Sequence, residues 1–177
     1  MNLIELIWPK LFWVFREHFK SHVYGGAYLT ALQTRAIDIF SGSYKPDTII
    51  LQAGGNDLDR STVPEVKYEY AKLIKIIKGM CPNSRIIISE VPFRHHHGHR
   101  PWTRAKVTDL NGSLQALAKY FSANVEFQSF VPHESRFYWN DGLHLTDEGK
   151  CIYAHAIAKL LTNVSVNFQS SVKLPKT

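Results

Sequence analysis

The sequence has few cysteines and no long uninterrupted apolar run. Two cysteines in 177 residues are too few for a disulfide-stabilised fold, so we expect both thiols to be reduced. The apolar segment at residues 1–20 lacks the basic start, the continuous apolar stretch and the cleavage site of a signal peptide. It is also too broken to span a membrane, because it is interrupted by Glu5, Lys10, Arg16 and Glu17. These absences favour a cytoplasmic protein without membrane partners.

The sequence also lacks internal repeats and low-complexity tracts. Its composition, 45% hydrophobic and 20% charged, is typical of a soluble globular domain. The length predicts one domain at residues 1–162, followed by a tail at 163–177. The net charge of +6 and the pI near 9.3 permit an anionic partner. Without a nucleic-acid motif they do not predict one, so nucleic acid stays a possible but unexpected partner.

Apolar runs typical of buried strands alternate with segments of helical spacing. This alternation predicts a doubly wound α/β domain with a mostly parallel sheet, in which ligands bind beyond the carboxyl ends of the strands. We expect strands within 21–26, 48–55, 85–92 and 124–130, and helices at 8–19, 27–40, 64–80, 103–121 and 146–161.

Near the C-terminus, "WNDGLHLTDEG" places Asp141 three residues before His144. A carboxylate and an imidazole this close in a turn suggest a general base and the group that orients it. Thr146 is a suitable N-cap for the helix that follows. This interpretation requires a nucleophile for His144 to activate.

A second polar cluster, "LQAGGNDLD", follows the apolar run that begins at Thr48. Gly54 and Gly55 permit backbone conformations that other residues resist. Asn56 then offers an amide donor at a strand end, where such a group can stabilise a developing oxyanion by roughly 3 to 4 kcal/mol.

Together these segments resemble the SGNH hydrolase family of GDSL-type esterases and lipases, over about residues 21–162. The resemblance implies a three-layer α/β/α, flavodoxin-like fold and hydrolysis of short acyl or acetyl esters, without a cofactor or metal. It implies that Gly26, in the second block, and Asn56 form the oxyanion hole. In the third block Gly54, Gly55 and Asp57 support Asn56, and in the fifth His144 is the base oriented by Asp141.

The block that carries the nucleophile is not found. In the family a serine follows the first strand in a Gly-Asp-Ser-like turn, but here the only serine before Gly26 is Ser21, and no Gly-Asp-Ser occurs. The first central strand of the sheet is therefore expected to be missing as well. The chain as written is expected to be inactive unless it is extended at its N-terminus, with a residual rate enhancement of about 10³ to 10⁴ over water.

Two alternatives to an esterase remain open at this stage. One is a catalytically inactive SGNH-like binding module for RNA or another anionic partner, and the other is a fragment that does not fold stably. The loop at 95–99 contains four histidines, but adjacent histidines without a cysteine or carboxylate at ligand spacing do not predict a metal site. Its positive flanks could instead favour an anionic substrate. The sequence does not predict an oligomeric state.

Overall fold

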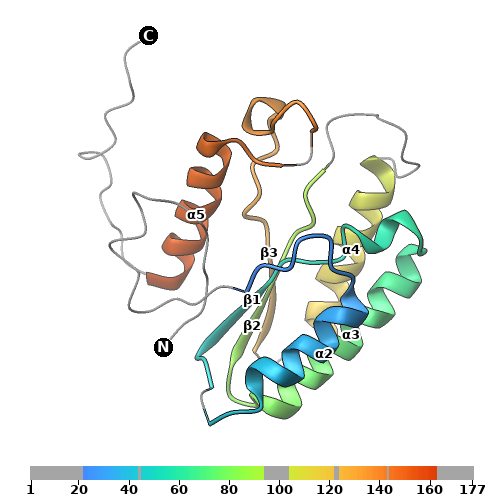
Figure 1. The fold of residues 1–177 in the computed structure, drawn as a ribbon, viewed down its shortest axis with the longest axis vertical. Coiled ribbons are helices and arrows are strands. Elements are labelled where there is room, and N and C mark those ends of the chain that lie inside the picture. Colours follow the sequence, from blue (N-terminus) through green and yellow to red (C-terminus); the bar gives the residue numbers. More distant parts are fainter. Residues whose placement is uncertain (1–21, 44, 94–103, 122–123, 143, 163–177) are drawn as a thin grey trace.

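The structure is a computed structural model that describes residues 22–43, 45–93, 104–121, 124–142 and 144–162. The expected helix at 8–19, the histidine-rich loop at 95–99 and the tail at 163–177 lie outside these residues. The described helices are α2 (Leu29–Phe40), α3 (Val63–Met80), α4 (Arg104–Phe121) and α5 (Asp147–Thr162), with short 3-10 helices η1 (Asp57–Asp59) and η2 (Ser135–Phe137), and the strands are β1 (Thr48–Leu51), β2 (Arg85–Ser89) and β3 (Val125–Gln128) (Figure 1).

The described strands form one parallel sheet in the order β1-β2-β3. Ile49 pairs with Ile86 and Ile86 with Val125, so apolar residues lie side by side across the sheet. Successive strands are joined by α3 and α4, as parallel neighbours require. The predicted α/β class and parallel sheet are confirmed, and the four helices agree with the predicted ones to within a few residues.

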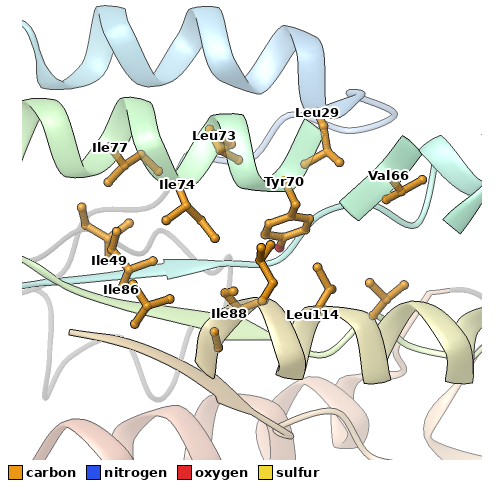
Figure 2. Packing of buried hydrophobic residues seen from close by; sticks show 14 of the residues in the cluster. Leu29, Ile49, Val66, Tyr70, Leu73, Ile74, Ile77, Ile86, Ile88 and Leu114 are labelled. Atoms are coloured by element: carbon orange, nitrogen blue, oxygen red, sulfur yellow. The ribbon is translucent and has the colours of Figure 1, made fainter. Parts of the chain in front are cut away.

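Side chains alternate between the two faces of the sheet, and each face has its own core. Ile86 and Ile88 of β2 pack on the side of α2, α3 and α4, whereas Ile87 packs with Tyr153 and Ile157 of α5. Figure 2 shows the first core, where the fully buried Tyr70 of α3 lies between Leu29 and Leu114. Helices on both faces make this a three-layer α/β/α arrangement (Figure 1).

Local signals explain where two of the helices begin. Thr62 accepts a hydrogen bond from the Glu65 N–H, and the Glu65 carboxylate accepts one from the Thr62 N–H, which forms a capping box at the start of α3. At α5, Gly149 donates its N–H to Thr146 Oγ1 at 3.2 Å, which supports the predicted N-cap. None of the helices in the described ranges has the length and apolar character needed to cross a bilayer.

One predicted strand does not form. Residues 22–24 are not part of the sheet, and Gly25 and Gly26 form a turn that is closed by a hydrogen bond from the Ala27 N–H to the Tyr24 carbonyl. The aromatic and β-branched side chains at 22–24 suit a strand, but strand conformation in a sheet also requires a hydrogen-bonded neighbour. Val23 remains 70% exposed, and none of the described strands lies against it.

Candidate active site

Asp141 and His144 form a pair in the loop between β3 and α5. His144 Nδ1 lies 2.6 Å from Asp141 Oδ2, and the His144 backbone N–H donates to Asp141 Oδ1 at 2.9 Å. Since the carboxylate oxygen accepts, Nδ1 carries the hydrogen and Nε2 is the nitrogen that can take up a proton. The sequence prediction that these two residues interact therefore agrees with the geometry.

The backbone of this loop holds the pair in place. Tyr138 and Leu145 form an antiparallel bridge, and Trp139 donates its N–H to the His144 carbonyl at 2.8 Å. Gly142 has a φ of +64°, which suits a glycine at this tight turn. The side chains of His144 and Asp141 are 72% and 49% exposed. An ion pair this exposed adds little stability, so the loop, not the pair, fixes the geometry.

Asn56 lies against the turn that contains Gly26. Asn56 Nδ2 donates to the Ala27 carbonyl at 3.2 Å, and Gly26 adopts a φ of +73°. The Arg60 guanidinium covers the Tyr28 ring, 3.2 Å from its centre. The structure thus brings the two expected oxyanion donors to neighbouring segments. Because an amide nitrogen carries two hydrogens, the bond to Ala27 leaves Asn56 a second donor for a ligand.

Asp57 is a buried residue that connects the loop after β1 to the start of α2. It is only 6% exposed, and both of its carboxylate oxygens lie near the Leu29 N–H, at 3.1 and 3.3 Å. Leu29 begins α2, and the preceding Tyr28 provides no side-chain cap. Asp57 therefore satisfies a helix N-terminus that lies 28 residues away in sequence.

Gly54 explains why the loop after β1 can pass so close to the core. Its φ is +93°, and an added Cβ would lie 3.4 to 3.6 Å from the side chains of Val66, Tyr70 and Leu110. The positive φ is the stronger reason for glycine here, because those contacts are ordinary van der Waals distances. Gly55 has no such conformational requirement in this structure.

We expect the stability contribution of Asp57 to depend on pH. Burial raises the pKa of its carboxyl above the ordinary value of 3.8, and the bond from Leu29 opposes that shift. A carboxyl with a raised pKa contributes fully below its unfolded-state pKa and loses that contribution as the pH rises through the folded-state pKa. The free energy of unfolding of wild type relative to Asp57→Asn should therefore fall as the pH rises above the ordinary carboxyl pKa of 3.8. Urea unfolding at a series of pH values measures this difference, and a difference that grows with pH would contradict it.

Asn56 and the Asp141–His144 pair lie at the same edge of the sheet but follow different strands. Asn56 follows β1 and the Asp141–His144 loop follows β3, with β2 between them (Figure 1). The ends of β1 and β3, from which these two segments continue, are two strand spacings apart, which is about 10 Å. Asn56 and the Asp141–His144 pair are therefore both at the carboxyl edge, where ligands of parallel sheets bind. Ser21, the serine nearest to Gly26 on its N-terminal side, lies outside the described residues.

Sequence analysis missed a further cluster at this edge. Glu90 directly follows β2 and is 7% exposed, and its Oε1 lies 3.3 Å from Nε2 of His133. Ser129 Oγ is 3.5 Å from the same nitrogen. In a serine triad the acid and the hydroxyl use different ring nitrogens, so this cluster does not have that arrangement. The signal that could have revealed Glu90 is the presence of a charged residue directly after the apolar run at 85–89.

No group of three or more histidine, cysteine, aspartate or glutamate side chains in the described part of the chain is arranged to hold a metal ion. The free thiols Cys81 and Cys151 have raised pKa values because of burial. The polar side chains described at the sheet edge include an imidazole paired with a carboxylate and a set of hydrogen-bond donors. Groups of these kinds can support acid–base and oxyanion chemistry.

Comparison with known proteins identifies the family of this chain. Residues 21–150 match the model of the GDSL-like lipase/acylhydrolase family, so the chain belongs to that family. No curated protein matches the chain.

Similar solved structures include esterases and lipases. A candidate acylhydrolase from Bacteroides fragilis is 17% identical, with a TM-score of 0.71 over 84% of this chain and 77% of that one. A GDSL-like lipase from Bacteroides thetaiotaomicron is 20% identical, with a TM-score of 0.68 over 84% and 78%. A psychrotrophic esterase from Pseudoalteromonas, inhibited by monoethylphosphonate, is 15% identical, with a TM-score of 0.65 over 82% and 76%. At these identities the likeness shows the shared fold.

Proposed function

We propose that this protein is an ester hydrolase domain with His144 as general base, Asp141 as its orienting carboxylate, and Asn56 and the Gly26 N–H as oxyanion donors. The observation that carries the proposal is the 2.6 Å contact between His144 Nδ1 and Asp141 Oδ2, in a chain of the GDSL-like lipase/acylhydrolase family. The substrate class is a carboxylic ester with a short acyl or acetyl group.

The proposed reaction needs a serine that these 177 residues do not place in a Gly-Asp-Ser turn. The serine oxygen attacks the ester carbonyl while His144 Nε2 takes its proton, and Asn56 and Gly26 stabilise the oxyanion. His144 then gives the proton to the leaving alcohol as the carbon–oxygen bond breaks. Water, deprotonated by the same nitrogen, hydrolyses the acyl-serine and releases the acid.

Mapping the 5′ end of the native transcript tests where this serine comes from. The proposal expects in-frame codons upstream of Met1 that encode an apolar strand followed by Gly-Asp-Ser or a close variant. A reading frame that opens at Met1 would leave the esterase proposal without a nucleophile in this chain. It would favour the second candidate, an inactive binding module.

The net charge of +6 is the observation that supports the binding-module candidate. An RNA-binding module should show an association constant that falls steeply with salt, because binding releases counterions from phosphates. Retention on immobilised RNA at increasing salt concentrations separates the two candidates. An ester hydrolase without RNA affinity should not be retained even at low salt.

A further inference from the structure

An exposed tryptophan lies opposite His144 in the turn that carries the proposed base. Tyr138 and Leu145 form an antiparallel bridge, and the Trp139 N–H donates to the His144 carbonyl at 2.8 Å. In an antiparallel pair, the residue after Tyr138 stands opposite the residue before Leu145. Trp139 is therefore the cross-strand neighbour of His144. Side chains at opposite positions point to the same face, with their Cβ atoms about 5 Å apart.

The two faces of this bridge differ in burial. Tyr138 is 6% exposed and Leu145 packs against the core on the α5 side of the sheet, so their face is turned inward. Trp139 is 53% exposed and the His144 side chain is 72% exposed, so their face is turned to solvent. A single exposed aromatic side chain is ordinary on a protein surface. What distinguishes Trp139 is its place beside the proposed base, at the sheet edge where ligands bind.

The backbone of Trp139 is held at both of its polar groups. Its N–H donates to the His144 carbonyl, and its own carbonyl accepts from the Gly142 N–H at 2.7 Å. The indole is thus attached to a fixed point of the turn that also carries His144. A tryptophan side chain has only two rotatable bonds, so a ligand that covers it costs little conformational entropy. Trp139 therefore offers a rigid apolar surface next to the imidazole.

The proposed reaction determines which part of an ester meets this surface. His144 Nε2 gives its proton to the leaving alcohol, so the alcohol oxygen must come within about 3 Å of that nitrogen. The carbonyl oxygen lies toward Asn56, which follows β1, and the end of β1 is two strand spacings, about 10 Å, from the end of β3. The alcohol side of the ester is thus the side nearest to Trp139.

We propose that Trp139 is a specificity-determining residue that binds the alcohol part of the substrate, and that this part contains a ring with an apolar face. The placement of the alcohol rests on the proposed function. The flat C–H face of a ring covers an indole and removes apolar area of both from water, whereas a short linear alcohol leaves most of the indole exposed. The substrate class is an acyl ester of a cyclic alcohol, and the ring is a carbocycle or a sugar.

Binding is tested with the full 177-residue protein by NMR of its ¹⁵N-labelled indole groups. The Trp139 signal is the one that disappears in Trp139→Phe. Cyclohexyl acetate and a methyl glucoside acetylated at O6 are titrated separately, with ethyl acetate as the small-alcohol control. At least one ring ester should shift the Trp139 signal saturably, with a dissociation constant about tenfold or more below that of ethyl acetate. A response to only one ring ester identifies the kind of ring. No saturable shift with either would overturn the proposal.

Three variants test whether the indole itself makes the contact. Trp139→Ala should weaken binding of the ring ester by about tenfold, whereas Trp139→Phe, which keeps a flat ring, should stay within about threefold of wild type. Tyr120→Ala is the matched control, because Tyr120 is a 79% exposed aromatic residue in the last turn of α4, and it should bind as wild type does. Line broadening of the ligand signals measures binding in every variant. Equal binding by Trp139→Ala and Tyr120→Ala would overturn the assignment of the site.

Kinetics of a form of the protein that contains the nucleophilic serine separate this proposal from the proposed function. In Trp139→Ala the ratio of kcat/KM for cyclohexyl acetate to that for ethyl acetate should fall about tenfold. The ratio for ethyl butyrate to ethyl acetate should not change, because these esters differ only in the acyl group. A disturbed turn would lower all three values together and leave both ratios unchanged, which would overturn the proposal.

The two proposals can fail separately. Binding that depends on Trp139 without hydrolysis of any of the esters supports a ring-binding site and contradicts the proposed function. Hydrolysis with an unchanged ratio between the cyclohexyl and ethyl esters supports the proposed function and overturns the role of Trp139 in specificity.

Discussion

Replacing Gly149 by alanine is expected to lower the free energy of unfolding by about 2 to 4 kcal/mol. A Cβ at this position would lie 2.3 Å from the Phe137 carbonyl oxygen, 3.0 Å from the Phe137 Cβ and 3.1 Å from Leu145 Cδ2. The first of these contacts is with backbone, which a rotamer change cannot relieve. Either α5 or the segment that carries Phe137 must move, and both are buried at this point.

Gly112→Ala is the matched control for this change. Gly112 lies inside α4, where an added Cβ meets nothing within 4 Å. Alanine should therefore stabilise the protein by about 0.5 to 1 kcal/mol through its higher helix propensity. Thermal unfolding followed by circular dichroism should show the midpoint of Gly149→Ala lower by roughly 5 to 15 °C. Equal midpoints for wild type and Gly149→Ala would mean that α5 does not pack on Phe137 as described.

The contact at Gly149 also concerns the candidate site. Thr146 donates its N–H to the Phe137 carbonyl at 2.8 Å, the same oxygen that a Cβ at position 149 would strike. Tyr138 and Leu145, the next residues inward, form the bridge that closes the loop around Asp141 and His144. A shift of α5 would therefore move the proposed base as well as lower stability.

Replacing His144 by alanine is expected to lower kcat for p-nitrophenyl acetate by about 10³-fold or more. The comparison is made in a form of the protein that contains the nucleophilic serine. His144 is the ring that Asp141 holds with Nε2 available for a proton, and its removal leaves the serine without a base. The side chain is 72% exposed, so the melting temperature should stay close to that of wild type. Loss of activity with unchanged stability is the result that indicates catalysis.

His133→Ala is the matched control for the base. His133 is also an exposed histidine at the carboxyl edge, and its Nε2 lies between Glu90 and Ser129. Because Glu90 and Ser129 both face the same ring nitrogen, His133 cannot pass a proton from a hydroxyl to a carboxylate-oriented ring as a triad base does. The loss of His133 should therefore change kcat by no more than a few-fold. Retained activity in His144→Ala with loss in His133→Ala would overturn the assignment of the base.

Much of the fold was predictable because its signals are local. The apolar run at 85–89 and the helical spacing between 63 and 80 follow from side-chain periodicity alone. The capping box at Thr62 and Glu65 and the N-cap at Thr146 are likewise readable within four residues of sequence. Residues 22–24 show where this reasoning fails, because a strand forms only if another strand lies beside it.

The candidate site also has a part that is encoded locally in the sequence and a part that depends on long-range packing. Asp141 and His144 are three residues apart, so one turn is enough to bring them together, and the sequence by itself determined that pair. Only the tertiary structure decided that Asp57 would cap α2 and that Asn56 would reach the Ala27 carbonyl, across 28 and 29 residues. Contacts of this kind arise from packing between distant elements, for which a single sequence carries no local signal.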